Sequence, residues 1–545
     1  MASGQPTSSI LKTTLLPLAL LAASAAGLAA LLAVDAARVG ADPAVLMDLD
    51  PAAAAATIGS AGEIVAAILA LAITVVAIVV EMSSNRYTHR VADLFVRAPV
   101  NFLVMGFYIL TACQALLVSL AFDYNDQGQP EYVPILGVWV ASGMLLLAVL
   151  SLLPYFAFVF AFLNPLNIIA RIRQQTIRHL SRSRGDTSAK KQEALRGIEQ
   201  LADLGQSALT SREKGVSVAC VDALGELVGE YQTLNQRLPP AWFEVDGELA
   251  HDLDFVSLSP ELLEQITADR TWFEMKVLRR YEALFRVAVG DSPDINHLVA
   301  IWTRRLVEGT PKGEVSALAV RFFNTYLRIA LNAGDPRTAY NVLQQYRLLA
   351  AHALDYDDGV LTLSIGEHLL YYARLAFQLD QRFVVETIGQ DFRLLCEAAY
   401  DKRSLITPAL LKQFLRLDGE IHLDGDEDLA LRGVRKAQAQ LATFYLQRND
   451  EKPARAIWAD MKDEPISRIA SIRAELMRVT EPQFWEINDR GVNFEYLPEE
   501  RRALLDVFFG WFKGLDQTRA PQNTSLILDQ TLKPTPLRHL LDELD

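Results

Sequence analysis

The sequence predicts an all-α protein in which an N-terminal four-helix transmembrane region precedes a large cytoplasmic helical domain. Four long apolar stretches lie within the first 180 residues, and a helix needs about 20 mostly apolar residues to cross a bilayer. From Lys190 onward, apolar residues recur at helical spacing and the alternation typical of strands is scarce. A single core seldom serves more than roughly 250–300 residues, so a chain of 545 residues should contain several domains.

Composition excludes some classes of function. The chain has 52 Lys and Arg against 66 Asp and Glu, a formal net charge of −14, and most of the acidic excess lies after residue 180. An acidic surface repels phosphate, so we expect no nucleic-acid partner. Cys113, Cys220 and Cys396 are isolated in the sequence, which predicts free thiols rather than a disulfide framework or a zinc site.

The four predicted spans are residues 11–34, 64–82, 102–122 and 134–163. A cleaved signal peptide is the alternative for the first span, although its apolar run is longer than the usual signal-peptide core of about 7–15 residues. The centres of the four stretches contain no Asp, Glu, Lys, Arg or His. Because proton-driven transporters usually carry such groups within the membrane, this pattern argues against one.

Charge in the connections predicts the orientation of the spans, because Lys and Arg in short loops stay on the cytoplasmic side. Arg38 is the one basic residue between the first two spans, where four Asp also lie, and the third connection has acidic residues but no Lys or Arg. The second connection and the residues after the fourth span are basic. We therefore expect a multi-pass protein of the cell (inner) membrane with both termini in the cytoplasm.

The basic second connection has a helical pattern of its own. Tyr87, Val91, Leu94, Phe95 and Ala98 fall on one side of a helix, Ser83 to Asn85 are good N-cap residues, and Pro99 discourages continuation. We predict a short interfacial helix over residues 87–98, with a loop that only sets the topology as the alternative. The membrane lipids are predicted partners here, and the candidate contacts to anionic lipid are Arg86, Arg90, Arg97, Arg171, Arg173 and Arg178.

The same connection carries a resemblance to a known family. The segment SSNRYTHRVADLF, with Ser83, Ser84, Arg90 and Val91, is followed by the Gly-aromatic run Gly106 to Tyr108. This resembles a family of bacterial predicted membrane proteins of unknown function, and the resemblance covers roughly residues 60–300. The family usually has a Pro-containing step where this chain has Gly215-Val216-Ser217. The resemblance implies a membrane placement and no defined activity.

The remainder of the chain divides into a membrane-proximal helical domain (residues 181–300), a helix-hairpin domain (301–515) and a tail (516–545). Two polar turns, NAGDPRTA from Asn332 and NDEKPARA from Asn449, share the frame Asn-x-x-x-Pro-x-x-Ala, and Leu379 to Arg382 is a third candidate turn. Stacked helix pairs of this kind predict an α-solenoid-like domain, with a non-repeating bundle as the alternative. A short strand is expected within residues 242–256. The amphipathic end of the tail, residues 537–545, is predicted to be a small docking helix or a frayed end.

Motifs for catalysis or cofactor binding are missing. The string DGEIHLDGDED (418–428) imitates the start of a calcium loop, but Leu429 and Arg435 stand where that loop needs Gly and Glu. Paired histidines, phosphate-binding glycine motifs and GxSxG are all lacking. We therefore predict no catalytic, cofactor-binding or metal-binding residues and no enzymatic activity.

The function predicted from these features is that of a scaffold or adaptor, in which the membrane region anchors a helical domain that binds an unidentified protein partner. The alternative is a channel or transport component, a homo-oligomer gated by its cytoplasmic domain.

The predicted orientation can be tested directly. A topology reporter fused at Asp126 should be located on the outer side of the membrane, because that connection contains acidic residues and no Lys or Arg. A cytoplasmic signal from this fusion would contradict the predicted orientation.

Overall fold

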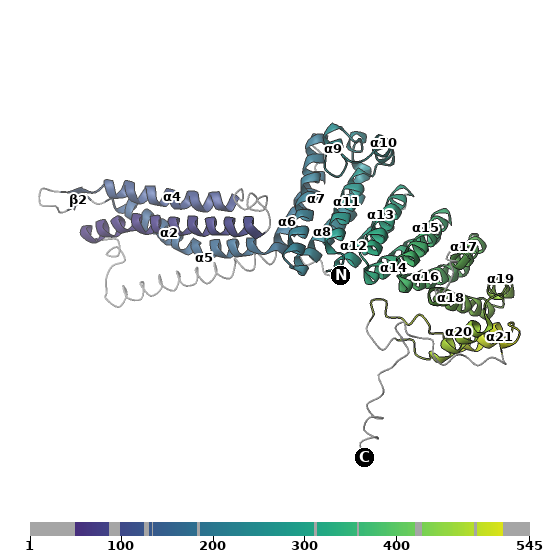
Figure 1. Ribbon diagram of the computed structural model, residues 1–545. Coiled ribbons are helices and arrows are strands. Elements are labelled where there is room, and N and C mark those ends of the chain that lie inside the picture. The colour runs from purple at the N-terminus through teal and green to yellow at the C-terminus, as the bar shows by residue number, and fades with distance from the viewer. Residues whose placement is uncertain are drawn as a thin grey trace, which may run out of the picture. The chain divides into compact units, whose positions relative to one another are not determined.

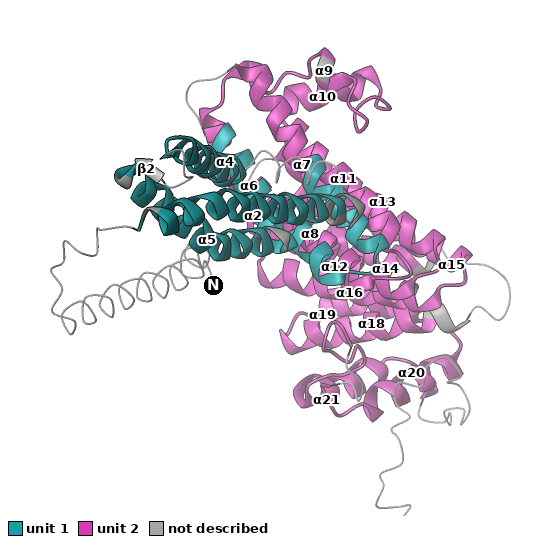
Figure 2. Cartoon of the chain, turned by 90° about the vertical axis from the view of Figure 1, so that its left-hand side faces the viewer, with its two compact units in different colours: residues 1–179, 199–223 teal, residues 180–198, 224–545 magenta. Residues whose placement is uncertain are grey.

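The computed structural model describes residues 50–86, 99–124, 130–132, 134–181, 186–309, 313–356, 359–419, 428–483 and 488–515. These residues are helical apart from turns, irregular connections and one two-stranded hairpin, which confirms the predicted all-α class (Figure 1). The chain forms two compact units (Figure 2). Unit 1 comprises residues 1–179 and 199–223, and unit 2 comprises residues 180–198 and 224–545.

Unit 1 contains three long apolar helices, α2 (Pro51–Arg86), α4 (Pro99–Leu120) and α5 (Ile135–Leu163). Each includes a stretch long and apolar enough to cross a membrane: Ala52–Glu81, Val100–Leu120 and Leu136–Ala161. These stretches correspond to the second, third and fourth predicted spans. The first predicted span, residues 11–34, lies outside the described residues, so the count of four remains a prediction.

Helix α2 is longer than the predicted span at both ends. It begins at Pro51, thirteen positions before Ile64, because the alanine run that follows Pro51 has the highest intrinsic helix propensity. It ends at Arg86, so Ser83 to Asn85 lie within the helix, and their prediction as N-cap residues is wrong. The predicted interfacial helix, residues 87–98, lies outside the described residues.

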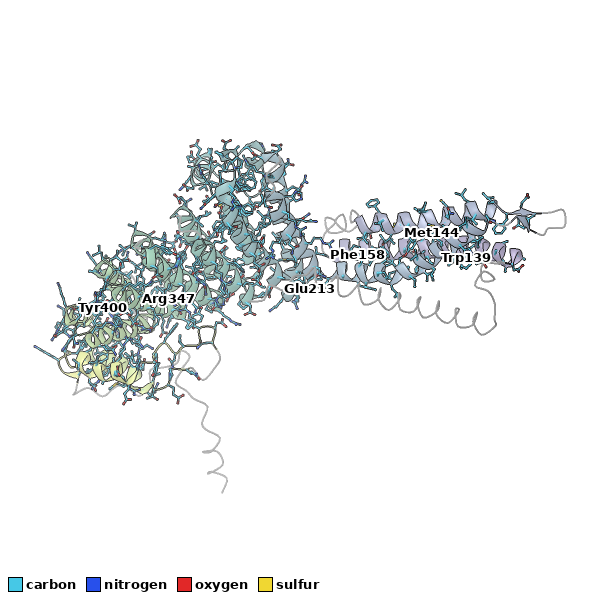
Figure 3. The ribbon with its side chains drawn as sticks, turned by 180° about the vertical axis from the view of Figure 1, so that it is seen from behind. Trp139, Met144, Phe158, Glu213, Arg347 and Tyr400 are labelled. Atoms are coloured by element: carbon cyan, nitrogen blue, oxygen red, sulfur yellow. The ribbon has the colours of Figure 1, made fainter. Side chains whose placement is uncertain are left out.

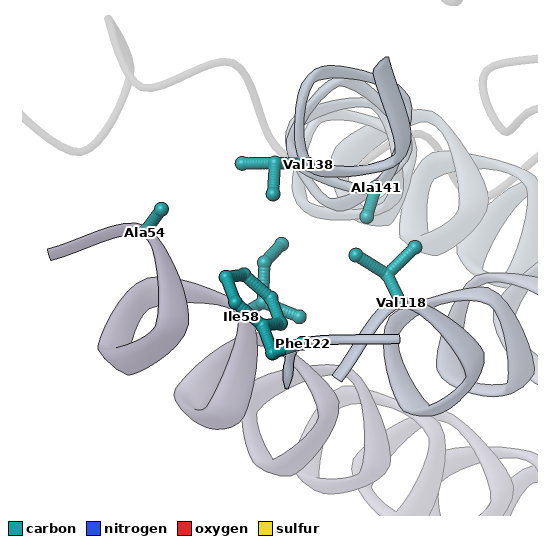
Figure 4. Packing of buried hydrophobic residues seen from close by; sticks show 6 residues of the cluster. All are labelled: Ala54, Ile58, Val118, Phe122, Val138 and Ala141. Carbon is teal, nitrogen blue, oxygen red and sulfur yellow. The ribbon is translucent and has the colours of Figure 1, made fainter. Parts of the chain in front are cut away.

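The three long helices of unit 1 pack on one another. At one end, a small core joins Ala54 and Ile58 of α2 to Val118 and Phe122 and to Val138 and Ala141 (Figure 4). Nearer the other end, the hydroxyl of Tyr155 donates to Asn101 Oδ1 at 3.3 Å. Since early residues of α4 face late residues of α5, these two helices are antiparallel.

A short hairpin connects α4 to α5. Its strands, β1 (Asp123–Tyr124) and β2 (Pro130–Tyr132), pair antiparallel with an irregular register. The strand predicted within residues 242–256 is absent. That segment contains the end of a 3₁₀ turn, η3 (Pro240–Trp242), and the short helix α9 (Gly247–Ala250), whose first turn is capped when Leu249 N donates to Asp246 Oδ1 at 3.0 Å.

After α5, Asn164 adopts an extended conformation and separates α5 from α6, with Pro165 as the first residue of α6. Pro is tolerated at a first helical position because its missing N–H has no partner there. The helices that follow, up to α12, are α6 (Pro165–Ser181), α7 (Thr187–Thr210), α8 (Lys214–Leu234), α10 (Pro260–Asp269), α11 (Trp272–Ala288) and α12 (Pro293–Glu308).

The rest of unit 2 consists mainly of helices joined by short turns. Its helices are α13 (Gly313–Asn332), α14 (Pro336–Ala353), α15 (Gly359–Gln378), α16 (Arg382–Asp401), α17 (Thr407–Gly419), α18 (Asp428–Gln447), α19 (Glu451–Met461), α20 (Ile466–Arg478) and α21 (Glu499–Phe509). Alternate helices pack side by side, so that α12, α14, α16 and α18 form one row and α11, α13, α15 and α17 form another (Figure 1).

The turns between these helices share one local geometry. Gly334, Asp380, Arg403 and Asn449 are left-handed and end their helices. At each turn the next residue donates its N–H to a carbonyl five positions back, as when Asp335 N binds Ala330 O at 3.1 Å. The two asparagines of the predicted frame are not equivalent, because Asn332 ends α13 whereas Asn449 is the left-handed residue.

Side chains also link successive turns to each other. Asp335 caps α14 by accepting from Thr338 N at 3.0 Å, and its other carboxylate oxygen accepts from Gly290 N of the preceding turn at 3.1 Å. Gln381 Nε2, in the following turn, donates to Leu331 O at 2.7 Å. This hydrogen bond links that turn to the end of α13. Asp335 therefore both caps α14 and links it to the preceding turn.

A close contact in unit 2 gives a test of this packing. A Cβ on Gly225 of α8 would fall on ring atoms of Trp302, whereas Gly229, one turn later, has open space around it. Gly225→Ala should therefore lower the free energy of unfolding by about 1–3 kcal/mol.

The control for this prediction is Gly229→Ala, which should raise the free energy of unfolding by about 0.5–1 kcal/mol because alanine favours a helix. Both can be measured as shifts in thermal unfolding of the detergent-solubilised chain. Equal effects of the two substitutions would contradict the contact.

Candidate membrane surface and interaction groove

The helices of unit 1 expose an unusually apolar surface. Phe102 and Leu103 of α4 and Leu136 of α5 are each at least 70% exposed, and Phe160 is also exposed. Trp139 and Phe158 lie on the same helix as Leu136 (Figure 3). Exposure of this much apolar area to water costs about 25 cal/mol per Å², so the surface fits lipid hydrocarbon.

Charged residues near the two ends of the α2–α4–α5 bundle differ in sign. Asp50 directly precedes α2 and Asp123 follows α4, and both ends meet in the core around Ala54 and Phe122. At the opposite end α2 finishes in Arg86. Helix α6, which follows α5, carries three further arginines. One end of the bundle is thus acidic, and the chain at the other end is basic.

The arginines predicted to contact lipid differ in their exposure to solvent. Arg178 is exposed on α6, where it donates to Gln174 Oε1 at 3.3 Å, while Arg171 and Arg173 of the same helix are partly buried. Burial lowers the pKa of Arg171. Arg86 is the last residue of α2, and Arg90 and Arg97 lie outside the described residues. Lipid contact by the six arginines remains a prediction.

Glu63 is a residue that the sequence reasoning missed. It lies inside α2 and inside the apolar stretch Ala52–Glu81, and its side chain is exposed. The predicted span began one residue later, at Ile64, so Glu63 was assigned to the loop. The helix-forming alanine run after Pro51 was the signal that could have extended the span.

In unit 2, the row α14–α16–α18 is crossed by a chain segment that we call the crossing segment, residues 488–498. Its central contact is a buried ion pair between Arg490 and Asp391 of α16. Arg490 donates to both carboxylate oxygens, at 2.8 and 3.2 Å, and Arg347 of α14 donates to one of them at 3.1 Å. The Arg490 guanidinium also lies over the ring of Tyr340, 4.1 Å from its centroid.

Both ends of the crossing segment are held as well. Near its start, Arg337 of α14 donates to both carboxylate oxygens of Asp489, at 2.9 and 3.0 Å. These hydrogen bonds hold the pKa of Asp489 below its usual range. Farther along, Gln440 Nε2 of α18 donates to Phe494 O at 2.8 Å, and Glu495 pairs with Lys436 of α18.

Lys436 is itself buried among three carboxylates, those of Glu386, Glu475 and Glu495. Burial alone would lower its pKa, but the three carboxylates raise it above its usual value. The row is therefore covered by the chain's own charged residues, and a partner would have to displace them to reach it.

An open groove lies where α16, α17, α18 and α19 meet. Its volume is about 1090 Å³, and its apolar lining includes Leu405, Pro408, Leu411, Leu415, Pro453 and Ala456. Leu405 is 93% exposed although it is a large apolar residue. Tyr400, at the end of α16, lines one side and donates its hydroxyl to Asp450 Oδ2 at 3.2 Å (Figure 3).

The charged groups of this groove are mostly positive, with four cations against two carboxylates. Arg448 pairs with Asp401, whereas Arg403, Lys412 and Lys452 are exposed and form no ion pair with any carboxylate of the described residues. Tyr445 is fully buried, and its hydroxyl has no hydrogen-bond partner within the described structure. Burial raises the pKa of Tyr445, so the hydroxyl stays protonated and can donate a hydrogen bond.

In the described residues, the remaining candidate residues form no metal-binding or catalytic cluster. Most of the calcium-like string 418–428 lies outside the described residues, and within the described part of the chain no three His, Cys, Asp or Glu residues are grouped to hold a metal. All three cysteines are free, and Cys220 and Cys396 are buried. His368 contacts the hydroxyl of Tyr346 at 3.1 Å, and burial lowers its pKa.

Comparison with known proteins finds a membrane-protein family, which is consistent with the apolar helices of unit 1. Residues 12–228 match the family model described as "Predicted membrane protein (DUF2254)". The predicted resemblance is thereby confirmed. The matched residues begin before the predicted start near residue 60 and end before residue 300, so they contain the three apolar helices and little of unit 2. The function of this family is not known. No curated protein and no solved structure matches the chain.

The buried Arg490–Asp391 pair can be tested by mutation. Arg490→Met should lower the free energy of unfolding by roughly 3–5 kcal/mol, because it leaves a buried carboxylate with one fewer cation. It should also make the crossing segment sensitive to limited proteolysis, which can be followed by mass spectrometry.

Arg382→Met is the matched control, because Arg382 pairs with the largely exposed Asp380. An exposed pair of this kind contributes about 0–1 kcal/mol. If the two arginine variants unfold alike and resist protease equally, the crossing segment is not held by Asp391.

Proposed function

We propose that this protein is a scaffold or adaptor, anchored in the cell's inner membrane by its N-terminal helices, whose unit 2 binds another protein in the cytoplasm. The apolar surface of α4 and α5 and the family match support the membrane anchor. The acidic end of the bundle and the arginines of α2 and α6 support an orientation with both chain termini in the cytoplasm. Bound anionic lipid at these arginines is part of the proposal.

We further propose that the hairpins from α11 to α18 form an α-solenoid-like stack. The side-by-side packing of alternate helices supports this, as do the hydrogen bonds that join successive turns. Left-handed turn residues at positions 290, 334 and 380 recur at nearly equal intervals, as expected for a repeated hairpin. Such stacks offer an extended surface for recognition of proteins.

The observation that carries the proposed binding function is the groove between α16 and α19. It combines an exposed leucine, an apolar lining and three cations without ion-pair partners among the described residues. A catalytic site would need a paired acid and base or an activated nucleophile, and this groove offers neither, so an adaptor fits it better than an enzyme. The excess of cations here predicts a partner segment that is both apolar and acidic.

One observation favours the alternative function, a channel or transport component. Glu63 lies within an apolar helix, and ionisable groups in such positions often mark a path for ions. The two functions are distinguishable, because a chain that is monomeric in detergent and gives no ion flux in liposomes would exclude the channel.

A photo-crosslinking residue at Leu405, introduced in native membranes, should form an adduct with a second protein. The same residue at Val256, which is also exposed and apolar, serves as the control and should not form that adduct. Lys412→Glu should reduce the Leu405 adduct at least fivefold, because it reverses one charge of the groove. If Leu405, like Val256, yields no protein adduct even in a chain whose segment 537–545 carries Leu540→Asp with Leu541→Asp, the binding function of the groove is refuted.

A further inference from the structure

We propose that the groove between α16 and α19 is occupied by residues 537–545 of this same chain. This inference rests on the proposed function, because the segment and a partner protein would compete for one surface.

The sequence of residues 537–545 matches the groove in both polarity and charge. Leu537, Leu540, Leu541 and Leu544 stand at i, i+3, i+4 and i+7, so in a helix they would form a single apolar face. The other positions hold Asp542, Glu543 and Asp545 against one Arg and one His, which makes the segment acidic.

The lining of the groove is complementary to this segment, because it supplies apolar contacts for the leucines and cations for the acidic groups. Its exposed Leu405 and the neighbouring Pro408 and Leu411 can cover a leucine face, and Arg403, Lys412 and Lys452 can pair with acidic side chains. Cations without ion-pair partners are notable in a chain of net charge −14, where nearby acidic groups are plentiful.

The last described residues pack against a helix that also lines the groove. The described residues end at Leu515, just after Trp511 and Phe512. Both rings lie against α19, since Arg455 stacks over Trp511 at 3.7 Å and Phe512 contacts the ring of Trp458. The same helix supplies Lys452, Pro453 and Ala456 to the groove.

The connection is long enough to reach. Residues 516–536 separate Leu515 from the segment, and 21 residues of chain can extend over at most about 70 Å. Helix α19, with 11 residues, is about 16 Å long. A tether that reaches its site makes the contact intramolecular, so even a weak contact is populated more than the same contact between two separate molecules.

The test measures binding of a fluorescent peptide of residues 535–545 to the full chain in detergent. Leu540→Asp with Leu541→Asp, introduced in the chain, should empty the groove, and the peptide should then bind at least tenfold more tightly than to the unmodified chain. Adding Leu405→Asp to the double variant should weaken peptide binding at least tenfold. Adding Val256→Asp, the matched surface control, should leave it unchanged.

Two binding results would overturn the inference. No peptide binding to the double variant would mean that the groove does not accept this segment. Equal affinity for the double variant and the unmodified chain would mean that the segment does not occupy the groove in cis, while the groove would still accept an acidic helix, as the proposed function requires.

A cysteine crosslink separates occupation in cis from occupation by a second copy. Cysteines at Leu405 and Leu541, in a Cys113→Ser background, should be joined within one chain by a short bis-maleimide. Buried Cys220 and Cys396 should not react, because burial raises the pKa of both thiols. A covalent dimer in place of the intrachain product would overturn occupation in cis. Val256→Cys paired with Leu541→Cys is the control and should not be joined.

Discussion

The buried carboxylate of Asp391 organises the charged surface of unit 2. It receives Arg347 from α14 and Arg490 from the crossing segment, so one group ties two helices of the row to a piece of chain about a hundred residues farther on. A buried charge is tolerated only when it is paired, and Asp391 is 1% exposed, so the position of Arg490 follows from that requirement. With the crossing segment held there, α14, α16 and α18 are covered along that face, whereas the groove at α17 and α19 is open.

The same logic of pairing distinguishes the groove from the rest of unit 2. Elsewhere along α18, Arg432, Arg435 and Lys436 each meet a carboxylate. In the groove, three cations meet none within the described residues. Where a protein with an acidic excess leaves cations unpaired beside an exposed leucine, an acidic and apolar ligand is the natural complement. Whether that ligand comes from the same chain or from another protein is what the peptide and crosslinking experiments separate.

In unit 1 the controlling constraint is lipid. Within the described bundle, the side chains buried between α2, α4 and α5 include small ones, such as Ala54 and Ala141, and larger ones, such as Phe122, while many other large apolar side chains face outward. That distribution is the reverse of a water-soluble bundle, and it is expected where helices associate by close packing in hydrocarbon. Glu63 is the exception, a carboxyl within an apolar helix, and it is the reason that a transport function still has to be tested.

The sequence by itself determined the helical class and three long apolar helices, because each depends on local composition and periodicity. Runs of about 20 apolar residues and turns such as that at Asn449 need no distant partner to be recognised. It misplaced the start of α2 and proposed a strand in residues 242–256, where boundaries and short elements depend on context.

Only the tertiary structure decided which charges meet. Nothing in the spacing of Arg347, Asp391 and Arg490 along the chain relates them, since the pairing arises when α14, α16 and the crossing segment pack together. The groove has the same origin, because its lining comes from the ends of four helices, and no single stretch of sequence contains it. A ligand surface assembled in this way can be seen only after folding, because burial and electrostatic pairing are properties of the packed chain.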